Sequence, residues 1–185
     1  MNLINILTIS GSLRAQSSNS ALLQGIAALA PGHFRFTDYN GLGDLPHFNP
    51  DLDGDGDLPH AAVSDLRAQL KLADAVILCT PEYANGVPGV LKNALDWIVS
   101  SGEFVHKPTA VISASPNPLG GDKAHASLLL TLTMMTASIV ENGRLMVPFV
   151  RSKVSSEGVI TDSSTAVACT LMLQSLEQSI HLNKY

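Results

Sequence analysis

The sequence is poor in cysteine and in positive charge. Only Cys79 and Cys169 occur among 185 residues, which excludes a disulfide framework and favours reduced thiols. The 11 Lys and Arg residues stand against 16 Asp and Glu residues, and no stretch is basic or arginine-rich. Because nucleic-acid binding needs a positively charged surface, we expect no nucleic-acid partner.

The sequence also lacks a membrane-spanning run and a signal peptide. Its longest apolar stretch, residues 126–140, is interrupted by serine and threonine and falls short of the roughly 20 residues that a membrane span needs. Residues 1–7 have neither a basic region nor a small-residue cleavage site. We therefore expect no membrane association and a cytoplasmic location, and we interpret the apolar stretch as a buried or interface-forming helix.

No pattern of metal ligands is present. The six histidines, at positions 33, 47, 60, 106, 125 and 181, show no paired-ligand spacing. Residues 51–57 resemble the start of an EF-hand loop, with Asp51, Asp53 and Asp55 at its first, third and fifth positions. The twelfth position is Ala62 instead of the bidentate glutamate, so we interpret the segment as a solvated acidic turn and predict no metal site.

The sequence does contain a regular alternation of strand-like and helix-like segments. Expected strands cover residues 3–9, 33–38, 75–79, 109–113 and 144–147; expected helices cover 19–30, 59–72, the segment carrying Leu91 to Ile98, 121–140 and 163–180. A long loop, residues 39–58, is the expected movable rim. Such alternation implies right-handed crossovers and a parallel sheet covered on both faces. We predict one α/β domain over residues 1–185, a flavodoxin-like three-layer sandwich with strand order 2-1-3-4-5.

The loop after the first expected strand is rich in hydroxyl groups. It carries Ser10, Ser12, Ser17 and Ser18 around Arg14, and it leads into a helix at Asn19. Hydroxyls, a guanidinium and free helix N–H groups together favour an anion. Neither common nucleotide loop motif is present, so the segment suits a single phosphate group, or else it is a serine-rich turn that caps the helix.

Two further loops follow the third and fourth expected strands. Residues 81–86 offer Tyr83 for stacking on a flat ring, and the small Ala84 and Gly86 let backbone amides approach a planar partner. Residues 113–121 hold Ser, Pro and Gly, which are also ordinary turn residues. In the predicted strand order the three loops are neighbours, so one ligand with a phosphate and a ring can contact all of them.

Two segments carry a family resemblance. Gly11-Ser12-Leu13-Arg14 through Asn19, and Pro81-Glu82-Tyr83 through Trp97, resemble the two signatures of the NADPH-dependent FMN reductase family, which includes quinone, chromate and azo-dye reductases. The likeness runs over about residues 4–147. It implies an FMN phosphate bound by Ser12, Arg14, Ser17 and Asn19, with a ring lined by Pro81, Glu82, Tyr83, Ala84, Asn85 and Gly86 and closed by Ser113, Ser115 and Gly120. The sequence departs from the family at Ala84, where Asn is usual, and in having two prolines after Ser115.

The resemblance implies a reductase that works through its cofactor. FMN would accept hydride from NADPH or NADH and pass electrons to a flavin, quinone, azo compound or metal oxyanion, with both substrates alternating in a ping-pong reaction. We nominate no catalytic residue, because the flavin carries the chemistry. Two alternatives share the cofactor: a flavodoxin-like electron carrier and a non-catalytic flavin-binding module.

Four features have structural interpretations. Cys79 is expected to be a buried core thiol, and Trp97 a core or interface residue. Glu82 is either a carboxylate of the site or a structural partner for a helix end or a lysine. The helix expected over 121–140 is apolar on several faces, so we expect a homodimer or homotetramer.

Overall fold

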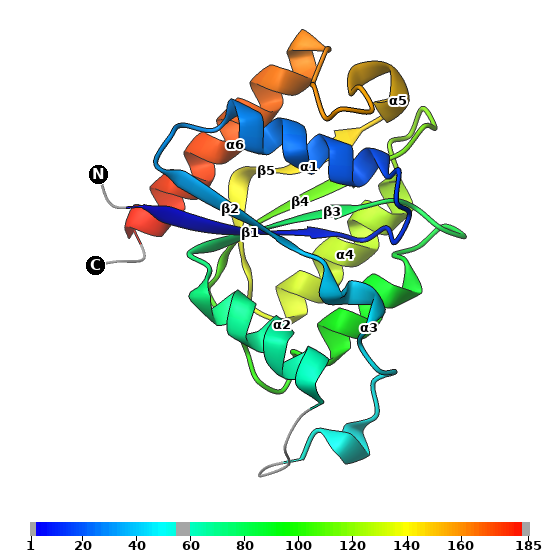
Figure 1. Cartoon of the computed structure of the whole chain (residues 1–185), viewed down its shortest axis with the longest axis vertical. Coiled ribbons are helices and arrows are strands. Elements are labelled where there is room, and N and C mark those ends of the chain that lie inside the picture. The colour runs from blue at the N-terminus through cyan, green and yellow to red at the C-terminus, as the bar shows by residue number, and fades with distance from the viewer. Residues whose placement is uncertain (1–2, 55–59, 183–185) are drawn as a thin grey trace.

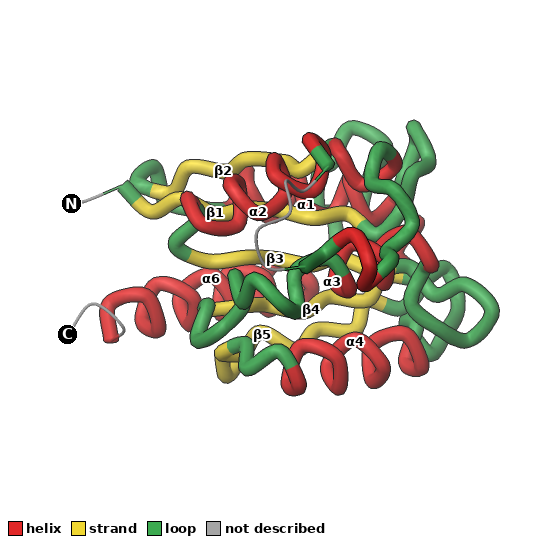
Figure 2. Tube along the Cα trace, turned by 90° about the horizontal axis from the view of Figure 1, so that it is seen from below, coloured by secondary structure: helices red, strands yellow, loops and turns green. Residues whose placement is uncertain are grey.

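The computed structural model describes residues 3–54 and 60–182. Within these ranges one sheet contains β1 (Ile4–Ser10), β2 (Phe34–Tyr39), β3 (Ala75–Thr80), β4 (Pro108–Ala114) and β5 (Ser138–Val147). Its order is β2-β1-β3-β4-β5, and each neighbouring pair is parallel. The predicted order, which Figure 2 shows, and the predicted parallel direction are therefore confirmed.

Helices cover both faces of the sheet, as predicted (Figure 1). The helices α1 (Ser18–Leu29) and α6 (Ser163–Leu182) lie on one face; α2 (Ala61–Leu72), α3 (Gly89–Asp96) and α4 (Asp122–Met134) lie on the other. In β1, Ile4 and Ile6 pack toward the first group, whereas Leu7 and Ile9 pack toward the second. Alternate side chains of a strand thus fill two separate cores. None of the described helices has the length and apolar character needed to cross a membrane.

The helix expected over residues 121–140 was predicted too long. It ends at Met134, and β5 begins at Ser138 instead of residue 144. Thr136 has a φ of 59°, its N–H donates to the Thr133 carbonyl at 3.0 Å, and the Ala137 N–H donates to Leu132 at 3.0 Å. These bonds form a Schellman motif, which usually has glycine at the left-handed position. Because Thr136 stands there instead of glycine, the sequence pattern did not indicate that the helix ends at this point.

Other boundaries differ less. The N-cap of α1 is Ser17, two residues before the predicted start at Asn19. A short helix, α5 (Val150–Lys153), follows β5 and was not predicted. The loop after β2 contains two short 3₁₀ turns, Gly41–Gly43 and Pro50–Leu52. Residues 55–59 lie outside the described residues, including the second half of the acidic segment 51–57.

The loop after β2, predicted to be a movable rim, is anchored to α3. The Asn93 side-chain amide and the Trp97 indole N–H both donate to the Pro46 carbonyl, at 2.9 and 2.8 Å. The Phe48 N–H donates back to the Asn93 amide oxygen at 2.7 Å. Trp97 itself is buried, as predicted. The described part of the loop is therefore held by side chains of a helix that is distant in sequence.

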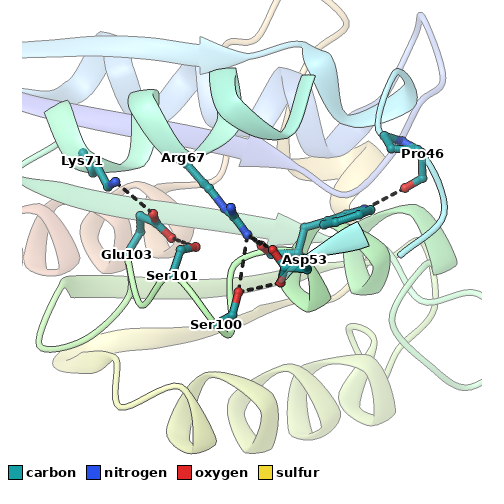
Figure 3. Close-up of polar contacts among 8 residues, drawn as sticks. Pro46, Asp53, Arg67, Lys71, Ser100, Ser101 and Glu103 are labelled. Carbon is teal, nitrogen blue, oxygen red and sulfur yellow. Dashed lines mark hydrogen bonds and ion pairs between the residues drawn. The ribbon is translucent and has the colours of Figure 1, made fainter. Parts of the chain in front are cut away.

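Arg67 of α2 anchors the same loop through Asp53 (Figure 3). Its Nη2 donates to Asp53 Oδ1 at 2.7 Å and to the Trp97 carbonyl at 2.5 Å, and Ser100 Oγ donates to Asp53 Oδ2 at 2.6 Å. Burial acts to raise the pKa of Asp53, but the bonds from Ser100 and Arg67 outweigh it and hold this pKa below its usual range. Asp53, weighed above as a calcium ligand, is thus engaged by a guanidinium.

We expect Arg67→Met to lower the free energy of unfolding by about 2 kcal/mol, because it leaves the partly buried Asp53 carboxylate without its counter-charge. Urea denaturation followed by circular dichroism measures the change. Arg35→Met, at an exposed position on β2, is the matched control and should change stability by less than about 0.5 kcal/mol. Equal losses in both variants would contradict the anchoring role.

Candidate functional site

A crevice of about 190 Å³ lies at the carboxyl ends of β1, β3 and β4. Nine of the predicted site residues line it: Ser12, Arg14, Ser17, Ser18, Asn19, Pro81, Glu82, Tyr83 and Ser115. They come from all three predicted loops. Parallel strands place their carboxyl ends on one edge of a sheet, which explains why residues separated by 70 or more positions in this sequence meet there.

Six predicted residues do not line the crevice. The Ser10 hydroxyl accepts a bond from Ser20 at 3.0 Å and faces a smaller hollow beside β2. Ser113 is fully buried, and its hydroxyl has no hydrogen-bond partner among the described residues. Gly120 packs against Pro148. The remaining three, Ala84, Asn85 and Gly86, belong to a turn beyond Tyr83.

Sequence reasoning missed Arg151 and Val150, which also line the crevice. Both lie in the short helix α5, which has no periodic sequence signal because it is a single turn. The Val150 N–H donates to the Ser115 carbonyl at 3.1 Å, so the third loop itself holds α5 at the site. The one feature of the sequence that could have pointed to Arg151 as a ligand of an anion is the small number of basic residues, 11 among 185.

The first loop ends in a capped helix. The Ser17 hydroxyl accepts bonds from the N–H groups of Asn19 and Ser20, at 3.2 and 3.4 Å, so the capping interpretation holds for this serine. No acidic residue occupies the first turn of α1. The positive end of the helix dipole is therefore not neutralised by its own side chains.

Two arginines from different elements converge on this helix end. Arg14 comes from the first loop and Arg151 from α5, and Glu82 is the only acidic residue among the described ones that line the crevice. Within the described part of the chain, neither guanidinium group makes an ion pair or a hydrogen bond. An unpaired guanidinium group beside a helix N-terminus favours a phosphate, and Arg14 lies on the loop that leads into α1. The geometry therefore fits the phosphate of FMN.

The first two loops approach each other closely at Gly11. Its N–H donates to the Cys79 carbonyl at 2.8 Å, and a Cβ in its place would lie 3.0 Å from Leu91 Cδ2 and 3.3 Å from Pro81 Cδ. A side chain at this position would require Leu91 and Pro81 to shift by a few tenths of an ångström. Ser12 and Tyr83 lie just beyond, with their hydroxyl oxygens 3.4 Å apart.

The second loop turns sharply after Tyr83. Tyr83 and Gly86 exchange two backbone hydrogen bonds, at 3.1 and 3.0 Å, and the central residues Ala84 and Asn85 have φ of 49° and 59°. These features indicate a type I′ turn, which favours Asn and Gly at its centre. Ala84, where the family usually has Asn, carries a steric cost of about 1 kcal/mol. The Tyr83 side chain remains about half exposed, so its ring is available to a ligand.

Glu82 is a structural partner for a helix end, one of the two roles predicted for it. Its Oε2 accepts bonds from the N–H groups of Lys123 and Ala124, at 2.8 and 3.0 Å. The N-cap residue of α4 is Gly121, which has no side chain to fill this role. Glu82 therefore caps α4 from another loop and joins the second loop to the third.

The two thiols are buried, as predicted for Cys79. Cys79 Sγ donates to the Asn19 side-chain oxygen at 3.1 Å. Burial, and secondarily Cys169, raises the pKa of Cys79 far above its usual value; burial raises the pKa of Cys169 to about 11. Both thiols stay protonated at neutral pH, and neither is a nucleophile. In the described part of the chain, no three His, Cys, Asp or Glu side chains cluster to hold a metal ion.

Comparison with known proteins identifies the same cofactor chemistry. Residues 4–151 match the family model for NADPH-dependent FMN reductases. An NAD(P)H-dependent FMN reductase of Pseudomonas aeruginosa is 34% identical over 94% of both chains, and a 2-hydroxy-1,4-benzoquinone reductase of a Burkholderia species is 33% identical over 88% of both. The flavoenzyme FerB of Paracoccus denitrificans, an NAD(P)H:acceptor oxidoreductase, has a TM-score of 0.83 at 28% identity and covers 96% of this chain and 99% of its own. The flavodoxin-like fold is thereby confirmed.

We expect Glu82→Ala to lower the free energy of unfolding by about 1–2 kcal/mol, because two N–H groups of α4 lose their acceptor. Glu82→Gln keeps an acceptor oxygen but loses the charge, so about half of that loss is expected. Chemical denaturation measures both variants. Glu141→Ala, at an exposed position on β5, is the control. A Glu82→Gln variant of unchanged stability but with turnover lowered more than about tenfold would instead indicate a role in proton transfer.

Proposed function

This chain belongs to the NADPH-dependent FMN reductase family, and from this premise we propose how its crevice holds the cofactor. The protein is an NAD(P)H-dependent, FMN-containing oxidoreductase that reduces a small-molecule acceptor. The observation that carries the proposed binding mode is Arg14 beside the α1 N-terminus, within a crevice that also contains Tyr83.

The phosphate of FMN is proposed to bind at the first loop. Arg14 supplies charge, and Ser12 and Ser18 supply hydroxyl groups around the start of α1. Ser17 and Asn19 shape the loop, Ser17 as the helix cap and Asn19 through its bond to Cys79. Ser10 supports them through Ser20.

The ring is proposed to lie between the second and third loops. Tyr83 borders it with a half-exposed side chain, and Pro81 and Ser115 line the wall of the crevice. Residues 84–86 and Gly120 contribute as backbone, and Ser113 lies beneath as a buried hydroxyl. The chemistry that FMN would supply when bound is acceptance of hydride from the nicotinamide and transfer of electrons to the acceptor. The residues of this chain orient the ring and leave one face open, so both substrates alternate in one pocket.

Three further proposals concern the domain organisation and location, the electron acceptor, and self-association. The chain is proposed to form one domain, because the described helices pack on the two faces of a single sheet. A cytoplasmic location is proposed because both cysteines are unpaired, which suits a reducing compartment. The physiological acceptor is proposed to belong to the flavin, quinone, azo or metal-oxyanion classes, since relatives of this chain are named as FMN, benzoquinone and azo reductases. Self-association through α4 is supported by Leu130 and Met134, which are 74% and 60% exposed and lie one helical turn apart.

An anaerobic titration tests the proposed function. We expect NADPH and NADH each to bleach the visible absorbance of the FMN-loaded protein, and a quinone to restore it, with parallel lines in double-reciprocal plots of the ping-pong reaction. Binding of FMN without bleaching by either nicotinamide would favour the electron-carrier alternative.

Affinity for FMN tests the binding mode. Arg14→Gln should weaken FMN binding about tenfold or more, because a charge-assisted hydrogen bond to the phosphate is lost. Flavin fluorescence measures the dissociation constant. The control is Arg35→Gln, which removes the same charge on the exposed side of β2. Unchanged affinity in the Arg14 variant would place the phosphate elsewhere.

Light scattering of the eluting protein tests self-association. We expect Leu130→Glu to shift the protein toward the monomer, because a buried interfacial charge is costly. Leu72→Glu, at an equally exposed leucine near the end of α2, should leave the mass unchanged. A wild-type protein that stays monomeric over a wide concentration range would remove the proposal.

A further inference from the structure

A second and larger hollow adjoins the crevice. This groove has a volume of about 710 Å³ and runs along the outer side of α1. Ser17, Ser20 and Gln24 form one wall at helical spacing, and residues 154–156, which follow α5, form the other. From Ser18 to Gln24 the helix rises roughly 9 Å, so the groove extends well past the helix N-terminus. Figure 1 shows α5 beside this half of α1.

The groove is positively charged in an acidic protein. Arg14 and Arg151 line it, and none of its lining residues is acidic, although the chain has a net charge of −5. The nearest acid in sequence is Glu157, whose carboxylate accepts the Ser156 hydroxyl at 2.7 Å. The same two arginines line the crevice, so groove and crevice meet between them.

One phosphate does not account for this arrangement. The phosphate of FMN is served by Arg14, the serines of the first loop and the start of α1. Arg151 adds a second cation from a different element, and the groove continues beyond it with the Gln24 amide and the Ser155 hydroxyl. Its volume is that of a pocket for a whole small molecule, about 300–1,000 Å³. A second phosphate placed beside the first needs its own counter-charge, because two like charges repel at close range.

We propose that this groove binds the phosphorylated adenosine end of the nicotinamide dinucleotide, with Arg151 as the ligand of its phosphate groups. The inference rests on the proposed function, which brings the nicotinamide to the ring beside Tyr83. The rest of the dinucleotide leaves the crevice where groove and crevice meet, between Arg14 and Arg151. The Gln24 amide and the serine hydroxyls of the groove can hydrogen-bond ribose and adenine; Ser17 and Ser155 already accept backbone N–H groups, and the Ser20 hydroxyl already donates to Ser10.

Calorimetric titration of the FMN-loaded protein with adenosine 2′,5′-bisphosphate tests this without turnover. We expect Arg151→Gln to weaken bisphosphate binding about tenfold and Arg151→Lys to weaken it less. Lys153→Gln removes the same charge from the same short helix, but Lys153 does not line the groove, so binding should change less than about twofold. In steady-state assays Arg151→Gln should raise the KM for NADPH about tenfold while kcat at saturation stays unchanged.

Three outcomes would overturn the proposal. Equal binding by the Arg151→Gln and Lys153→Gln variants would show that Arg151 makes no specific contact. A loss of FMN affinity in Arg151→Gln as large as in Arg14→Gln would assign Arg151 to the FMN phosphate. Inorganic phosphate that binds as tightly as the bisphosphate would show that the groove does not recognise a nucleoside. Failure of the proposed function would be seen separately, as a wild-type protein that neither retains FMN nor is bleached by NADPH.

Discussion

The parallel register of β1, β3 and β4 is the constraint on which the site depends. Ser10 pairs with Cys79, and Thr80 pairs with Ser113, so these three strands end level with one another. Their loops therefore begin at one edge of the sheet, where no strand continues and backbone groups are free to shape a crevice. The two cores on either face hold this register, because each strand buries alternate side chains against different helices.

Local polar contacts then set the loops relative to one another. Glu82 caps α4 and so joins the second loop to the third, and Ser115 accepts the N–H of Val150 and so holds α5 beside them. Gly11 lets the first loop lie directly against the second. A carboxylate that a sequence reader would assign to chemistry thus has a positioning role, which suits an enzyme whose chemistry resides in its cofactor.

The charge distribution is uneven in a way that serves anionic ligands. The chain is acidic overall, yet Arg14 and Arg151 both face the junction of crevice and groove. On the opposite side of the sheet, Arg67 donates hydrogen bonds to Asp53 and to the Trp97 carbonyl. These bonds anchor the loop after β2. Arginines of the same charge therefore differ in role according to burial and partners: the paired one stabilises the fold, and the unpaired ones are available to bind phosphate.

Periodicity and motif order were sufficient to determine the strand order, the two-faced helical cover and the three site loops, because these follow from local hydrophobic patterns and parallel topology. The same patterns did not reveal the end of α4 at Thr136, where a β-branched residue adopts a conformation typical of glycine. Nor did they reveal α5 and Arg151, since a single helical turn has no period. Three features were decided by the tertiary structure alone, because each depends on contacts between segments distant in sequence. Glu82 caps α4, and Ser10 and Ser113 do not line the crevice. Arg151 lines the same crevice as Arg14.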